Sequence, residues 1–275
     1  MPDYLIQALS QSDHNRLVPR RFVLGRTIPA VARAKTPWMT DPIQDDSAAR
    51  SYVVRQFWRL PELAAATGLG EEKTRQLVRA GCAPGPIYAW SGRWWSALSA
   101  CRGSDPAVPP KKAELYYSRS AAWDLRRAAL LIREGLAPAS AAAANRDHFV
   151  SEFTELLPTI EGAGEAFPSC WPHGIFNPDQ ARTAARAEWA TWLQGAYGVC
   201  LRAFNARNCI RKEALAARLK RQVANGAPLA LLDEVQALAE LILPFAPWER
   251  PTGTPGLTID AFLARSGLGD DLPYR

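Results

Sequence analysis

One short string in the second half of the chain combines residue types that could do chemistry. In Gly195–Arg202, a cysteine at position 200 lies two residues before an arginine, and two glycines flank Tyr197. A neighbouring cation can lower a thiol pKa and favour the nucleophilic thiolate, and glycines permit close approach of the backbone. The candidate catalytic residues are Cys200, Tyr197, Arg202 and Tyr117, whose phenol could line a pocket. The alternatives are a buried helical cysteine and packing of the adjacent tyrosines between domains.

A second set of charged residues could bind a ligand or an acidic partner. Residues 201–222 carry seven Lys and Arg against Glu213 alone, a balance of +6. Such a segment creates a positive field that attracts an acidic carrier protein or a nucleic acid. The candidate ligand- or partner-binding residues are Arg211, Lys212, Glu213, Arg218, Glu249 and Arg250. A solvated helix face and ion pairs between helices are the alternatives.

Metal and cofactor chemistry find little support in the sequence. The chain has three histidines and five cysteines without the spacing of a zinc site. Cys170 and His173 form one pair, whereas a metal needs three or four ligands. A phosphate-binding glycine loop and a nucleophile elbow are both missing. We therefore expect neither a metal nor a cofactor.

The most regular pattern lies nearer the N-terminus. Residues 60–67 and 71–80 predict two short helices joined by a tight Gly68–Gly70 turn, and Gly81 ends the second helix. Residues 88–95 predict a small β-wing. This pattern resembles the winged helix–turn–helix of MerR-type regulators, which implies a recognition helix for DNA. Its candidate nucleic-acid contacts are Lys73, Arg75, Gln76, Arg79 and Arg93.

The charge of the predicted recognition helix argues against a strong grip on DNA. Glu71 and Glu72 stand at its N-terminal end, and residues 59–79 carry four basic and three acidic side chains, a balance of only +1. Such a balance releases few counterions when the protein meets a duplex. Weak non-specific affinity is therefore expected.

The predicted organisation is mainly α-helical. Residues 1–52 predict an irregular arm, 53–102 the helix–turn–helix module, 103–114 a proline-rich linker and 115–275 an all-helical domain. Within that domain, Ser120 is a candidate cap, Asn177-Pro178 starts a helix that runs towards Cys200, and further helices cover about 209–223 and 228–243. The apolar stripe at 209–223 places the basic residues outward. Thr258 is a candidate cap for a last short helix.

Composition bounds the class of protein. The chain is 275 residues long and 48% hydrophobic, enough for a substantial core. Its apolar stretches are shorter than a bilayer requires, and its N-terminus lacks the pattern of a secretion signal. An odd number of irregularly spaced cysteines is typical of reduced thiols. These features predict a cytoplasmic protein that has no membrane association.

Several strings in the same order resemble a bacterial family of unknown function whose members are labelled natural product biosynthesis proteins. The resemblance covers about residues 57–250. The strings are Leu63–Gly68, Tyr116-Tyr117, Gly195–Leu201, Lys212-Glu213 and Pro244–Arg250. It implies a place in secondary-metabolite pathways, but no reaction and no cofactor. Where the family has a serine- and arginine-rich stretch, this chain has Pro251–Thr254.

Three hypotheses of function follow. The first is a pathway protein whose helical domain binds a small-molecule, carrier-bound or RNA-bound intermediate. The second is a MerR-like DNA-binding regulator. The third is a non-catalytic interaction protein, in which the helix–turn–helix serves packing. The sequence does not decide whether the protein is an enzyme, nor its oligomeric state.

Overall fold

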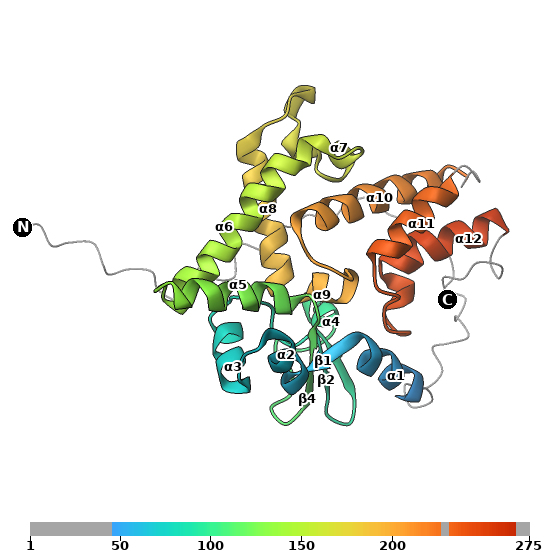
Figure 1. The fold of residues 1–275 in the computed structure, drawn as a ribbon. Coiled ribbons are helices and arrows are strands. Elements are labelled where there is room, and N and C mark those ends of the chain that lie inside the picture. Colours follow the sequence, from blue (N-terminus) through green and yellow to red (C-terminus); the bar gives the residue numbers. More distant parts are fainter. Residues whose placement is uncertain (1–45, 227–230, 268–275) are drawn as a thin grey trace, which may run out of the picture. The chain divides into compact units, whose positions relative to one another are not determined.

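The computed structural model describes residues 46–226 and 231–267, and helices dominate this part of the chain (Figure 1). The expected arm lies outside the described residues up to position 45, and its last part is helical instead of irregular. The helices are α1 (Asp46–Gln56), α2 (Leu60–Thr67), α3 (Glu71–Arg79), α4 (Ala97–Cys101), α5 (Ala121–Arg133), α6 (Pro138–Leu156), α7 (Ala163–Ala166), α8 (Pro178–Leu193), α9 (Ala196–Cys200), α10 (Ala206–Ala224), α11 (Leu232–Leu241) and α12 (Ala261–Ser266).

Four short strands form one antiparallel sheet in the order β1-β4-β2-β3. The strands are β1 (Phe57–Arg59), β2 (Tyr88–Trp90), β3 (Trp94–Ser96) and β4 (Glu114–Ser118). Strands β2 and β3 are the hairpin expected at residues 88–95. Strand β4 lies between β1 and β2, where Tyr116 pairs with both Arg59 and Tyr88. The region from residue 115 is therefore not all-helical, because its first residues complete a sheet that the preceding segment begins.

Helices α2 and α3 form where the sequence predicts them. Pro61 suits the first turn of α2, and Gly68 ends the helix with a φ of 70°, a conformation that glycine adopts without steric cost. Leu63 and Leu77 close the two helices on each other with no exposed surface. The pair is also fastened to the helical region, since Arg126 Nε of α5 donates to the Ala66 carbonyl at 3.0 Å.

The long helices surround an aromatic centre at Phe204, in the connection between α9 and α10. Its ring stacks on Trp192 of α8 at 4.3 Å and on Phe149 of α6 at 5.0 Å. The same hydrophobic core reaches Leu77 of α3 and Phe262 of α12. The small sheet, the α2–α3 pair and the long helices therefore share one interior.

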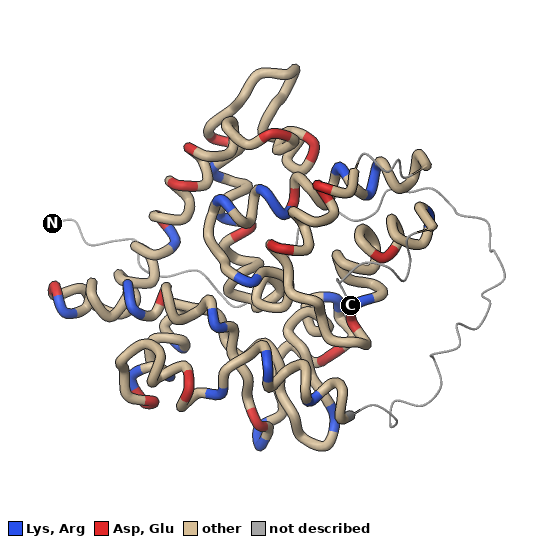
Figure 2. Tube along the Cα trace, turned by 45° about the vertical axis from the view of Figure 1, so that its right-hand side comes forward, with Lys and Arg blue, Asp and Glu red and all other residues tan. Residues whose placement is uncertain are grey.

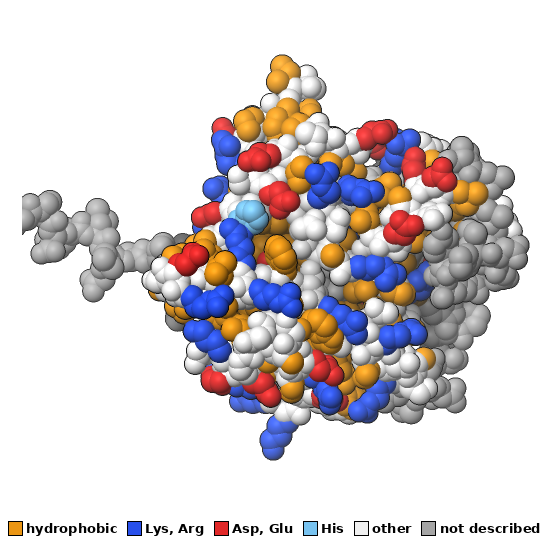
Figure 3. All heavy atoms as spheres, viewed as in Figure 1, with side chains coloured by type: hydrophobic (Ala, Val, Ile, Leu, Met, Phe, Trp, Pro, Cys, Tyr) orange, Lys and Arg blue, Asp and Glu red, His pale blue; other side chains and the backbone are white. Residues whose placement is uncertain are grey.

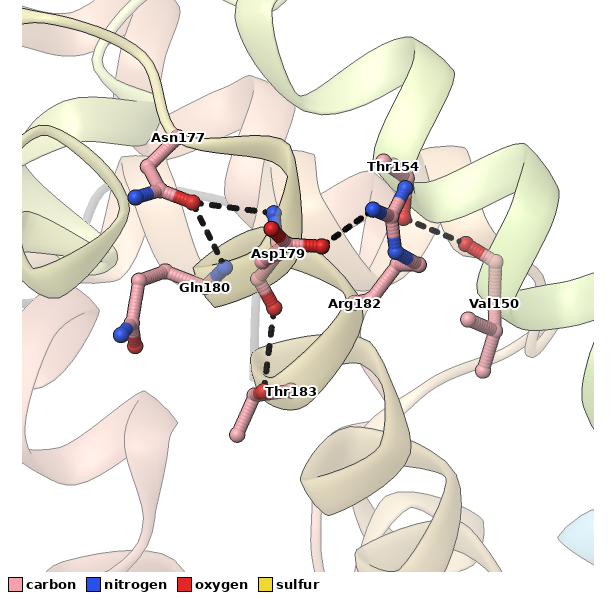
Figure 4. A network of polar contacts seen from close by, with 7 residues as sticks. All are labelled: Val150, Thr154, Asn177, Asp179, Gln180, Arg182 and Thr183. Atoms are coloured by element: carbon pink, nitrogen blue, oxygen red, sulfur yellow. Dashed lines mark hydrogen bonds and ion pairs between the residues drawn. The ribbon is translucent and has the colours of Figure 1, made fainter.

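Helix starts confirm some of the predicted caps and correct others. Asn177 caps α8, because its Oδ1 accepts from the backbone N–H groups of Asp179 and Gln180 (Figure 4). Ser120 does not cap α5; its Oγ instead accepts from Phe204 N at 2.6 Å. Thr258 lies inside a π-helical turn, Gly256–Asp260, that precedes α12, and its hydroxyl donates to Thr254 O.

Two later helices differ in length from the expectation. Helix α8 ends at Leu193, short of Cys200, because Gly195 takes a φ of 89° and redirects the chain into α9. Helix α10 is longer than predicted and extends from residue 206 to 224. Helix α11 covers 232–241, and residues 227–230 of the expected segment lie outside the described residues.

Candidate functional site

The two glycines of the Gly195–Arg202 string let α9 lie directly against the sheet and α4. A Cβ on Gly198 would be 2.4 Å from Ile87 Cδ1, and a Cβ on Gly195 would be 2.7 Å from Ala97 Cβ. Both distances are shorter than side chains tolerate. The predicted close approach of the backbone is therefore present, and it fixes where Tyr197 and Cys200 lie.

Tyr197 is buried between two carboxylates. Its Oη lies 2.5 Å from Glu188 Oε2 of α8 and 2.9 Å from Glu213 Oε1 of α10. A phenol has one proton, so it can donate to only one of these acids. The other acid must bring a proton of its own. Glu188, Tyr197 and Glu213 therefore form a chain of hydrogen bonds in which one of the two carboxyl groups is neutral.

The electrostatics identify the neutral member as Glu188. Burial, together with the charge of Glu213, raises its pKa from 4.5 to about 7. Burial also opposes ionisation of Glu213, but the charge and hydrogen bond of Lys212, the hydrogen bond of Tyr197 and the charge of Lys220 together outweigh it and lower the Glu213 pKa. A protonated Glu188 can thus donate to Tyr197 Oη while Tyr197 donates to the Glu213 carboxylate.

Lys212 corrects the expectation that the basic residues of α10 point outward. Its side chain is buried, and its Nζ lies 2.7 Å from Glu213 Oε1 and 5.5 Å from the centre of the Tyr197 ring. Burial acts to lower the Lys212 pKa, but the adjacent carboxylate reverses this and raises it. The Lys212–Glu213 pair is therefore an internal ion pair with a cation–π contact.

Cys200 does not have the lowered pKa that its neighbour Arg202 suggested. Burial raises the thiol pKa to about 11, although Lys212 acts in the opposite direction. Arg202 is exposed, whereas Cys200 is buried, and Arg202 is not among the main influences on the thiol pKa. At neutral pH the thiol is protonated and is a weak nucleophile.

Glu249 and Arg250 have partners within the chain. Glu249 is buried and accepts hydrogen bonds from Tyr88 Oη and Ser96 Oγ, and burial raises its pKa despite these bonds. Arg250 makes a two-pronged contact with Asp260, at 2.8 and 2.7 Å. Glu249 thus holds the segment before α12 onto the sheet, and Arg250 ties that segment to the turn at Asp260.

The other candidate catalytic residue, Tyr117, lies apart from this cluster. It is buried in β4, where burial raises its pKa and Arg75 and Arg79 of α3 act to lower it. Tyr197, Cys200 and Lys212 therefore come together with Glu213, whereas Tyr117 lies nearer α3.

The residues predicted to contact nucleic acid lie on α3 and on the hairpin turn. Gln76, Arg79 and Arg93 are exposed, whereas Lys73 is half-buried. Arg75 forms an ion pair with Glu72 one turn before it. The charge of Arg75 is thus neutralised within α3, which leaves less positive charge for a nucleic acid.

Exposed cations gather elsewhere, over α5, α9 and α10 (Figure 3). Figure 2 shows that basic and acidic positions are interspersed along the helices, so the ion pairs decide which charges remain. Arg218 of α10 pairs with Glu161 and Glu234, and Arg221 pairs with Glu165. By contrast, the exposed residues Arg202, Arg207 and Arg211 have no acidic partner within residues 46–226 and 231–267.

Two further arginines, Arg55 and Arg119, lie near the connection that carries Arg202. Arg119 donates to the Arg55 carbonyl at 2.5 Å and lies 5.4 Å above the Trp58 ring. The Ser120–Phe204 bond joins this place to the connection that carries Arg202. We name the set the arginine band: Arg55, Arg119, Arg202, Arg207 and Arg211. Sequence reasoning missed Arg55 and Arg119, because only the fold brings the end of α1 and the start of α5 near the connection between α9 and α10.

No helix in the described ranges is both long and apolar enough to cross a bilayer. Residues 146–267 match a family of unknown function (DUF6058). This match includes the Tyr197 cluster and Arg202, Arg207 and Arg211 of the arginine band, but not the α2–α3 pair. No curated protein and no solved structure matches the chain. The chain is therefore similar to a family of unknown function over its helical second half.

Proposed function

We propose that the protein is a component of a secondary-metabolite pathway that binds an acidic carrier, with its attached intermediate, on the arginine band. The observation that carries this proposal is the contrast along α10. Arg218 and Arg221 have acidic partners in neighbouring helices, whereas Arg207 and Arg211 have none among the described residues. Uncompensated surface charge of one sign favours association with a partner of the other sign.

The position of Arg207 strengthens the argument. It lies in the first turn of α10, after the cap at Asn205. A cation there meets the positive end of the helix dipole, which destabilises the helix by about 0.3–1 kcal/mol. Stability of the helix therefore does not account for this arginine, and an anionic partner would.

The buried cluster supports binding better than thiol chemistry. Its ionisable groups Glu188, Tyr197, Lys212 and Glu213 have partners within the chain, and the Cys200 thiol is protonated at neutral pH. We propose that this cluster holds α8, α9 and α10 together and thereby positions the band. The pathway assignment itself rests on the resemblance of residues 57–250.

The experiment is a titration of the full chain with a panel of purified acidic acyl carrier proteins. Calorimetry measures the affinity for each carrier. We expect binding that weakens as ionic strength rises. The triple variant Arg202→Gln/Arg207→Gln/Arg211→Gln should bind about 10-fold more weakly, since exposed charges contribute about 0.2–1 kcal/mol each. Arg186→Gln, an exposed arginine of α8, is the matched control. Absence of binding to every carrier, or equal affinity of the triple variant, would contradict the proposal.

A winged helix–turn–helix that binds DNA is the second candidate. The exposed face of α3 carries Gln76 and Arg79, and Arg93 stands at the hairpin turn, where a wing meets the phosphate backbone. The Glu72–Arg75 pair lowers the expected affinity. A mobility-shift assay at low salt tests this candidate. A shift that Arg79→Gln and Arg93→Gln abolish would support it, and the absence of any shift would remove it.

A further inference from the structure

The solvent-facing side of α5 exposes two large apolar residues. Trp123 has 67% of its surface exposed and Leu130 has 47%. Because they are seven residues apart, they lie on the same face of the helix, two turns from each other. The opposite face, with Ala121, Leu125 and Ala128, is buried in the core. The sequence pattern of α5 accounts for the buried side and leaves Trp123 and Leu130 without a partner in the described chain.

Three arginines flank these two residues. Helical spacing places Arg126 and Arg133 on one side of the Trp123–Leu130 line and Arg127 on the other. Arg126 donates to the Ala66 carbonyl, which leaves its charge in place. Arg127 and Arg133 have no ion pair within the described ranges. We name this surface the α5 face: Trp123, Arg126, Arg127, Leu130 and Arg133.

Acidic residues near α5 form no ion pair with this face in the described ranges. Burial raises the pKa of Asp124 to about 7, although the charge of Arg127 acts to lower it. Asp124 points inward and accepts a hydrogen bond from Trp192 Nε1 at 2.8 Å. Glu134 follows the last turn of the helix and forms no ion pair that the structure describes. The α5 face is thus an apolar strip bordered by positive charge.

We infer that the α5 face docks an amphipathic acidic helix of the carrier that we propose as the partner, so the inference rests on the proposed function. A helix with apolar residues at positions i, i+3, i+4 and i+7 would cover Trp123 and Leu130. Carboxylates on either side of that strip would meet the three arginines. The face therefore adds selectivity for a helix to the general attraction of the arginine band.

Other occupants fit the face less well. A second copy of the chain, related by a two-fold axis, would bring the α5 arginines of both copies together. Residues 1–45 carry six basic and four acidic side chains, so their charge does not complement the face. A single-stranded nucleic acid could stack a base on Trp123, but Leu130 offers it neither stacking nor a hydrogen bond.

The test uses a fluorescent helical peptide with leucines at i, i+3, i+4 and i+7 and glutamates on the flanks. A scrambled peptide of the same composition is the control ligand, and anisotropy reports binding to the full chain. We expect the striped peptide to bind more tightly than the scrambled one. Trp123→Ser should weaken the striped peptide by about 10-fold or more, as for a buried aromatic anchor, and leave the scrambled peptide unchanged.

Ile175→Ser is the matched control variant, because Ile175 is equally exposed, at 72%, on the loop before α8. It should change neither affinity. Circular dichroism of each variant tests whether the fold is retained. We expect that it is, because both replaced side chains are exposed.

The outcomes separate the two proposals. If the triple arginine variant weakens both peptides and Trp123→Ser weakens neither, the arginine band stands and the α5 face is overturned. If Trp123→Ser weakens the striped peptide and the triple variant has no effect, the α5 face stands and the band falls. Trp123-dependent binding of an oligonucleotide or of anionic vesicles, without binding of the striped peptide, would overturn the inference.

Discussion

The two sides of α10 carry the same kind of residue with opposite consequences. Arg211 and Lys212 are neighbours in the chain, yet Arg211 is exposed without a described acidic partner, whereas Lys212 is buried against Glu213. Adjacent helical residues point about 100° apart, so one faces solvent and the other the interior. Charge counted along the sequence therefore mixes groups that hold the fold with groups that are available to a partner.

The largest effect should come from removing the inward charge. Lys212→Ala leaves the Glu213 carboxylate without its cation in a mostly buried place, which should cost about 3 kcal/mol of stability. Urea unfolding measures this loss. Arg211→Ala, at the adjacent position, is the control. Equal losses in both variants would break the comparison between the two sides of the helix.

The raised pKa of Glu188 predicts that the stability of the inward side of α10 depends on pH. The fold raises the Glu188 pKa from 4.5 to about 7, so the folded state keeps a proton that the unfolded state releases. Stability should therefore fall as the pH rises from about 4.5 to 7. Glu188→Gln mimics the protonated acid and should be about 2 kcal/mol more stable than the parent at pH 8, but not at pH 4.5.

Unfolding curves at both pH values measure the effect. Glu155→Gln, which replaces an exposed glutamate of α6, is the control and should show little difference between the two pH values. A Glu188→Gln variant with the same pH dependence as the parent would mean that Glu188 is ionised throughout.

A third variant tests how closely α9, which carries Tyr197, packs against the sheet. A Cβ at position 198 would meet Ile87 Cδ1 at 2.4 Å and Cγ1 at 2.9 Å. Gly198→Ala should thus push α9 away from the sheet and cost about 1–2 kcal/mol. At Gly85, a Cβ would meet nothing within 4 Å, so Gly85→Ala is the matched control. Equal melting temperatures for the two variants would show that α9 is not tightly seated.

The smallest effect on stability should come from replacing the exposed arginines of α10. Arg211→Ala should change the free energy of unfolding by less than about 0.5 kcal/mol, because Arg211 has no described partner to lose. Arg207→Ala should leave the free energy of unfolding unchanged or raise it by up to about 1 kcal/mol, because it removes a cation from the positive end of the helix dipole. The same variants should weaken carrier binding. A large loss of stability would assign these arginines to the fold instead.

Much of the local structure could be predicted from short-range patterns. Gly68 marked the turn between α2 and α3, and Asn177-Pro178 marked the start of α8, since caps and turns depend on residues within one helical turn. The break after Leu193 was missed because Gly195 acts through a positive φ that the apolar pattern of α8 does not signal.

Features that depend on distant segments were beyond the reach of such patterns. Strand β4 pairs with segments far before it in the chain, so Tyr116-Tyr117 gave no sign of being a central strand. Helix α10 packs against α6, α7 and α11. More than one of its sides is therefore buried, and a single apolar stripe could not predict an internal Lys212.

The position of β4 determines which part of the chain can stand alone. A fragment that stops at residue 102 would lose the central strand, and β1 and β2 would each present bare backbone donors and acceptors to solvent. Such open edges promote aggregation. Grafting the bihelical segment onto another protein would thus require residues 114–118 as well. The smallest piece that could be transplanted is therefore longer than the α2–α3 pair alone.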